Sequence, residues 1–182
     1  MKKLFAVFMF FLLMIPAISE AQEPKTMCLI FKNIALTRNK ADEAKRDEIL
    51  NGLCIAMGTE MIDYSTGRRT ANNYVTDNHI QLGTSGFSKS DMQTVGKAVG
   101  ADYFVYVTIW ISGVRGGFNP FHSSLKKDLT ADMRIINVET GEDILGESAS
   151  ASGRKVEFSC LEDIVEKAKA DIKAKSLVFA KN

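Results

Sequence analysis

Residues 103–111 have the sequence YFVYVTIWI and form the most hydrophobic stretch of the chain after its first 21 residues. Every residue in it is β-branched or aromatic, and such residues favour β-strands. Apolar side chains occupy both alternating faces, which is typical of a strand covered on two sides. The stretch therefore predicts the central strand of a sheet.

The residues before this strand predict alternating strands and helices. Met27-Cys28-Leu29-Ile30-Phe31 is a short apolar run that predicts a buried first strand. Asn39 and Gly58 carry the start and stop signals of a helix, and Ser88 with Asp91 predicts a cap for a helix that Gly100 ends. Between these two helices we expect a strand at 60–64, a turn at 66–67, a further helix within 68–82 and a loop at 83–86.

The residues after the central strand predict a loop, a hairpin and a helix. Residues 113–122 are rich in glycine and predict the loop. Apolar and polar residues alternate on both sides of residues 139–142, which predicts an antiparallel hairpin over 128–152. Ser159 and Glu162 have the spacing of a capping box that opens an amphipathic last helix. The expected fold is α/β, with a mixed sheet, crossover helices, a late antiparallel hairpin and a C-terminal helix.

Residues 1–21 have the features of a secretory signal peptide. Two lysines follow Met1, twelve apolar residues fill Leu4–Ile15, and small residues lie at Ser19 and Ala21. The apolar run is shorter than the ~20 residues that cross a bilayer, so an uncleaved membrane anchor is the less favoured alternative. We expect cleavage after Ala21, which leaves a single domain over 22–182 with no integral membrane span. No cysteine lies directly after that site, where a lipid would be attached, so we expect a periplasmic or secreted protein without a lipid.

The composition and the motifs of the chain argue against several classes of function. The chain has 23 Lys and Arg against 22 Asp and Glu, a formal net charge of +1, which disfavours nucleic acid as a partner. The two histidines and three cysteines form no zinc-ligand spacing. A GxSxG motif and a phosphate-binding glycine motif at a helix start are both absent from the sequence. We therefore expect no catalytic residues, no metal and no cofactor.

The three cysteines are Cys28, Cys54 and Cys160. In an oxidising compartment an odd number leaves at least one of them unpaired. Free cysteine is one of the most buried residue types, so free core cysteines are favoured over a disulfide pair. The sequence does not say whether any two of them are bonded.

The best candidates for partner binding lie in the 113–122 loop. Two phenylalanines on a glycine-rich connection are unfavourable in water and suited to contact with another protein. The alternative is that both rings fold back and cover the sheet. The expected binding residues are Arg115, Phe118, Asn119, Phe121 and His122.

Residues 95–104 (VGKAVGADYF) and 131–142 (ADMRIINVETGE) resemble two segments of the CsgG family, the curli secretion component. The resemblance covers roughly residues 27–178, and the domain type is similar to the TolB N-terminal domain and to the lipoprotein activator of penicillin-binding proteins. It implies a non-enzymatic envelope protein that binds other envelope proteins during assembly or secretion, and it leaves a homo-oligomer open. This chain departs from the pattern in having no lipid-attachment cysteine. The alternative function is a periplasmic hydrolase or ligand-binding enzyme, which a pocket joining Cys54 or Cys160 to a histidine would favour.

Overall fold

The computed structural model describes residues 22–31, 40–82, 86–115, 118–119, 122–123, 126–153 and 156–181. The expected signal peptide and its cleavage site lie outside these residues or at their edge, and so does most of the expected loop at 83–86. Within the described ranges, no helix combines the length and the apolar character that a membrane crossing requires.

A mixed sheet of five strands in the order β2-β1-β3-β6-β7 confirms the expected fold class. β3 lies at its centre, parallel to β1 and antiparallel to β6, and β6 pairs antiparallel with β7. A second sheet consists of the two short strands β4 and β5. The strands are β1 (Lys25–Phe31), β2 (Glu60–Met61), β3 (Tyr103–Arg115), β4 (Phe118–Asn119), β5 (His122–Ser123), β6 (Lys126–Asn137) and β7 (Asp143–Gly153).

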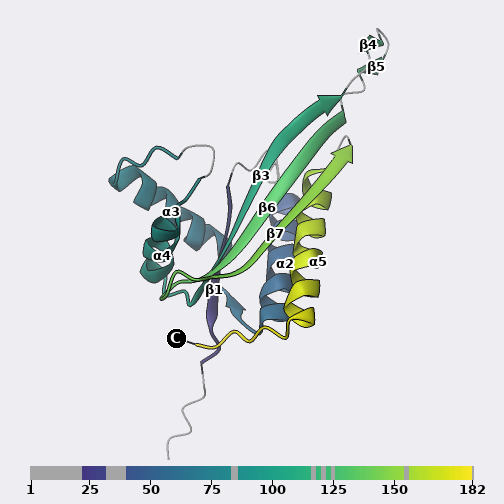
Figure 1. Ribbon diagram of the computed structural model, residues 1–182. Helices are drawn as coiled ribbons and strands as arrows, with labels where there is room; N and C mark the ends of the chain where they lie inside the picture. Colours follow the sequence, from purple (N-terminus) through teal and green to yellow (C-terminus); the bar gives the residue numbers. More distant parts are fainter. Residues whose placement is uncertain are drawn as a thin grey trace, which may run out of the picture.

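Helices cover both faces of the large sheet. α2 (Lys40–Met57) and α5 (Glu157–Ala174) lie side by side on one face, and α3 (Tyr64–Asp77) and α4 (Lys89–Ala98) lie on the other (Figure 1). Alternating side chains of β3 enter two separate cores. Val105 and Val107 pack in the core beneath α2 and α5, whereas Phe104 and Tyr106 pack in the core beneath α3 and α4. This double burial explains why residues 103–111 are apolar on both faces.

Local signals set several of these boundaries as expected. Ser88 and Asp91 form a reciprocal capping box at the start of α4, which satisfies two backbone N–H groups. Gly100 has a φ of +69° just beyond the C-cap residue Val99, a conformation that glycine adopts without strain. Gly58, which follows α2, also has a φ of +69°. The hairpin of β6 and β7 and the buried face of α5 also match the expectation.

The predicted strand at 60–64 and turn at 66–67 are wrong in part. β2 ends at Met61, and Tyr64 begins α3, so Thr66 and Gly67 belong to the first turn of that helix. The side chain of Asp63 accepts a hydrogen bond from the Thr66 N–H and caps the helix there. Tyr64 is buried by tertiary packing rather than by strand pairing.

The predicted capping box of Ser159 and Glu162 is also wrong. α5 begins at Glu157, its N-cap is Val156, and no side chain caps it. The Cys160 N–H already donates to the Val156 carbonyl at 2.9 Å. Ser159 therefore lies inside the first turn, where its backbone is helical and it cannot serve as the N-cap.

Candidate protein-binding surface

The central strand is longer than the sequence predicts. β3 continues through Gly113, Val114 and Arg115, which pair with Asp128, Lys127 and Lys126 of β6. The expectation of a loop over 113–122 is therefore wrong at its beginning. Glycine does not prevent a strand when a neighbouring strand supplies regular hydrogen bonds. The pairing shifts register between Ile111 and Gly113, so Ser112 forms a bulge.

We call residues 111–115 of β3 and 126–128 of β6 the arm. Figure 1 shows β3 and β6 continuing beyond the ends of the helices towards β4 and β5. The core does not cover this end of β3, and its last two apolar side chains are accessible to solvent. Ile111 is 40% exposed and Val114 is 58% exposed. The arm thus presents aliphatic side chains to solvent.

The Asp128 carboxylate joins the two strands of the arm to each other and to β7. Asp128 accepts hydrogen bonds from the Ser152 hydroxyl of β7 at 2.6 Å and from Arg115 Nε of β3 at 2.8 Å. These contacts, the one from Ser152 foremost, lower the pKa of Asp128 below its usual value. The Ser112 hydroxyl also donates to the Asp128 carbonyl at 3.2 Å. The bulge and the strand ends are therefore fixed by polar contacts rather than by a core.

A second contact attaches the arm to the body of the domain. Lys127 Nζ lies 3.4 Å from Glu157 Oε1 at the start of α5. The glutamate stands in the first turn of the helix, where negative charge is favourable. The arm is therefore tied to α5 as well as to β7.

The structure places Arg115 on the arm and the backbones of Phe118, Asn119 and His122 beyond it. Arg115 is the last residue of β3, and its side chain pairs with Asp128. The backbones of Phe118, Asn119 and His122 lie in the small β4–β5 hairpin, where Asn119 is opposite His122. Phe121 and the side chains of these three residues lie outside the described part of the structure. Whether the rings contact a partner or the sheet stays a prediction.

Sequence reasoning missed Ile111, Val114 and Asp128 as parts of this surface. A usable signal was present, because a basic residue before the connection and an acidic residue after it can meet across an antiparallel hairpin. Arg115 and Asp128 are such a pair.

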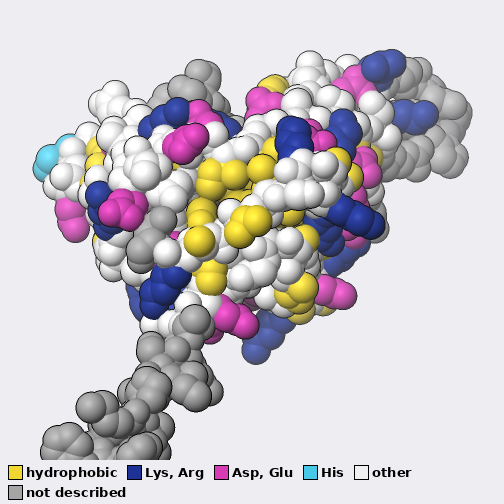
Figure 2. Space-filling view, turned by 60° about the horizontal axis from the view of Figure 1, so that its bottom comes forward, with side chains coloured by type: hydrophobic (Ala, Val, Ile, Leu, Met, Phe, Trp, Pro, Cys, Tyr) yellow, Lys and Arg dark blue, Asp and Glu magenta, His cyan; other side chains and the backbone are white. Residues whose placement is uncertain are grey.

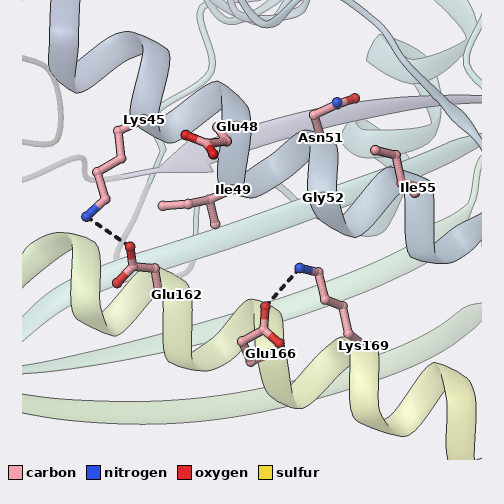
Figure 3. A pocket seen from close by; sticks show the side chains of 9 residues that line it. All are labelled: Lys45, Glu48, Ile49, Asn51, Gly52, Ile55, Glu162, Glu166 and Lys169. Atoms are coloured by element: carbon pink, nitrogen blue, oxygen red, sulfur yellow. Dashed lines mark hydrogen bonds and ion pairs between the residues drawn. The ribbon is translucent and has the colours of Figure 1, made fainter.

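A groove of about 610 Å³ lies between α2 and α5 and is the second surface feature (Figure 3). Lys45 of α2 reaches Glu162 of α5 at 2.9 Å, and Lys169 reaches Glu166 on its own helix at 2.8 Å. Ile55 at the rim is 68% exposed. The groove is lined by Lys45, Glu48, Ile49, Asn51, Gly52, Ile55, Glu162, Glu166 and Lys169.

This groove does not contain the pair of a cysteine and a histidine that would favour the alternative enzyme. Neither a cysteine nor a histidine lines it, and two of its glutamates are ion-paired with lysines. Cys54 and Cys160 are fully buried in the core, and burial raises the pKa of the Cys160 thiol, which disfavours the nucleophilic thiolate. In the described ranges, no group of three or more His, Cys, Asp and Glu side chains could hold a metal ion.

Charges of both signs are mixed over the surface. Figure 2 shows Lys and Arg side chains interspersed with Asp and Glu side chains around a central group of hydrophobic side chains. Side chains of opposite charge also form ion pairs, for example Arg134 with Asp143. This face therefore has no field of a single sign to attract a polyanion.

The fold defines a small α/β domain with a mixed sheet, and the arm is its most prominent surface feature. No protein-family model matches the chain, and no curated protein sequence matches it significantly. Solved structures to which the chain is similar include a lipoprotein, the C-terminal domain of LpoB and TolB.

Lipoprotein GNA1162 from Neisseria meningitidis is 12% identical, with 81% of this chain and 99% of that chain covered and a TM-score of 0.46. The LpoB C-terminal domain from Escherichia coli is 16% identical, with 78% and 92% covered and a TM-score of 0.38. TolB from Acinetobacter baumannii is 13% identical, with 81% and 28% covered and a TM-score of 0.41. Likenesses at this level give this chain neither a family nor a function.

Proposed function

We propose that this protein is an exported, non-enzymatic protein of the cell envelope that binds other envelope proteins through its arm and the β4–β5 hairpin. The observation that carries the proposal is the exposure of Ile111 and Val114 on β3, whose end polar contacts hold in place. Exposed aliphatic side chains on an ordered element favour association, because binding removes them from water without first ordering the strand.

The location follows from the expected signal peptide. Residues 1–21 are removed after Ala21, and the protein acts without a lipid in the periplasm or outside the cell. The resemblance to the CsgG family supports a role in envelope assembly or secretion, and a homo-oligomer fits the same surface. Intact mass of the exported protein should begin at or near Gln22. A chain retained at full length, or a diacylglyceryl adduct, would contradict this location.

Site-specific photo-crosslinking tests the arm directly. A photoreactive amino acid is placed at Val114 on the arm or at Ile55 on the α2–α5 groove, and the protein is irradiated in its own cells. Both positions are exposed aliphatic residues, so either substitution should leave the fold intact. We expect a discrete adduct with another envelope protein, or with a second copy, from Val114 only. Adducts from Ile55 only would move the binding surface to the groove.

The phenylalanines of the predicted loop give a second test. Phe118→Ala with Phe121→Ala should abolish the Val114 adduct while the melting temperature stays nearly unchanged. Aromatic anchors often dominate the energy of an interface, and their truncation costs about 2 kcal/mol or more. A large fall in melting temperature would instead assign the rings to the core, as the alternative interpretation holds. An unchanged adduct and an unchanged melting temperature would exclude both roles.

A further inference from the structure

Two of the three cysteines lie together in the core. Cys28 on β1 and Cys54 on α2 place their sulfur atoms 3.7 Å apart, although the residues are 26 positions apart in the sequence. Both side chains are buried, at 1% and 0% exposure. Cys160 is buried as well, but its Sγ is directed to the Ala149 carbonyl at 4.0 Å. The fold therefore selects one pair from the three that the sequence allows.

The two sulfur atoms are in van der Waals contact but are not bonded. The sulfur atoms of a disulfide are about 2.05 Å apart, so they need to approach by only about 1.7 Å. Rotation about the two Cα–Cβ bonds supplies most of such a movement. β1 and α2 already pack against each other in one core, which includes Leu50 and Leu53.

Other roles for the pair fit the site less well. A zinc site needs three or four ligands, and the described residues supply no such group around these thiols. The hydrogen bond with Cys54, together with burial, raises the pKa of the Cys28 thiol well above its usual value. A protonated, buried thiol is a poor nucleophile towards a substrate.

We infer that Cys28 and Cys54 form a disulfide when the chain folds in the presence of a disulfide oxidant, and that Cys160 remains a thiol. The oxidant is a small-molecule disulfide or the disulfide of a thiol–disulfide oxidoreductase. The structure then represents the reduced form, in which the two thiols are in contact.

The reaction proceeds by two exchanges. One cysteine loses its proton, and its thiolate attacks a sulfur of the oxidant, so that a mixed disulfide forms and the first thiolate leaves. The second cysteine, also deprotonated, attacks the protein sulfur of that mixed disulfide and releases the other thiolate. The protein loses two electrons and two protons, and the oxidant becomes two thiols. Because both cysteines are buried, we expect these steps before the core closes or during local opening of α2.

A refolding experiment counts the thiols. The full chain is unfolded in denaturant with dithiothreitol and refolded in a mixture of reduced and oxidised glutathione, and circular dichroism verifies the native fold. The product is alkylated in denaturant. We expect one reactive thiol per chain, against three after refolding with dithiothreitol alone. The oxidised form should melt higher by about 5–10 °C, since the bond restricts a loop of this length in the unfolded chain.

Trypsin identifies the bonded residues, because the three cysteines fall in the different peptides 26–32, 47–68 and 156–167. Peptides 26–32 and 47–68 should be recovered joined, two hydrogens lighter than their sum. Cys160→Ala should leave no thiol after oxidation, and Cys54→Ala should leave two. Three reactive thiols in the refolded wild-type chain, or a bridge that includes peptide 156–167, would overturn the inference. The number of reactive thiols in the wild-type chain tests the disulfide even if a variant fails to fold.

Discussion

Replacing Gly96 by alanine should destabilise the domain although alanine favours helices. Gly96 faces the core from α4, and an added Cβ would lie 2.7 Å from Val138 Cγ2 and 3.4 Å from Phe104 Cδ2. Both neighbours are buried, and a β-branched valine has few alternative rotamers. The better helix propensity of alanine contributes about 1 kcal/mol, whereas overpacking costs about 1–3 kcal/mol. We expect a net loss of about 1 kcal/mol, measured by urea unfolding followed by circular dichroism.

Gly52→Ala in α2 is the matched control. Among the described residues, and apart from the backbone of α2 itself, its added Cβ would approach the ammonium end of Lys169, with Nζ at 3.1 Å and Cε at 3.7 Å. That flexible end can move away, so the helix propensity should stabilise the chain by about 0.5–1 kcal/mol. The two variants should therefore change stability in opposite directions. Equal stabilisation by both would refute the argument that Gly96 is required by packing.

Three further changes test separate parts of the structure. Gly100→Val should lower the free energy of unfolding by about 1 kcal/mol or more through backbone strain alone, because its Cβ would meet nothing within 4 Å; a fully stable variant would contradict this. Hydrogen bonds from Ser65 and Thr66 lower the pKa of Asp63 to about 2, whereas its pKa in the unfolded chain is about 3.9. The ionised side chain therefore stabilises the folded state above pH ~4, and this stabilisation is lost as the pH falls towards 2. Asp63→Ala should lower the free energy of unfolding in urea by about 1 kcal/mol at pH 7. Between pH 4 and 2 the variant should lose less stability than the wild type. If the stability of both proteins falls in parallel over this range, Asp63 does not stabilise α3 as a cap. Asp128→Ala should speed amide hydrogen exchange at 112–115 and 126–128 with little change in melting temperature, and unchanged exchange would show that the carboxylate does not hold the arm.

The surroundings of Tyr106 show both what could be predicted from the sequence and what could not. Its hydroxyl accepts a hydrogen bond from the Phe87 N–H at 3.0 Å, and its ring packs edge-on against Phe87. The apolar pattern alone indicated that residues 103–111 lie between two layers. The hydroxyl contact itself joins residues 19 positions apart, so no local pattern could predict it.

Local signals were sufficient where a few neighbouring residues control the backbone. The run at 103–111, the capping box of Ser88 and Asp91 and the positive φ of Gly100 each depend on side chains close in sequence. The alternation over 128–152 also belongs to one hairpin. These elements and the mixed α/β class were therefore predictable, because propensity, periodicity and capping act within a few residues.

Tertiary structure alone decided the arm and the cysteine pair. Glycine at position 113 is compatible with a loop or a strand, and only the pairing with β6 determines that it continues β3. Asp128 meets Ser152 across 24 positions, and Cys28 meets Cys54 across 26. Such contacts depend on strand register and on how a helix packs on the sheet, and both are set by the burial of many side chains at once. The amino-acid sequence by itself therefore determined the class of fold, whereas the packing of the whole chain determined which residues stand together at its surface and in its core.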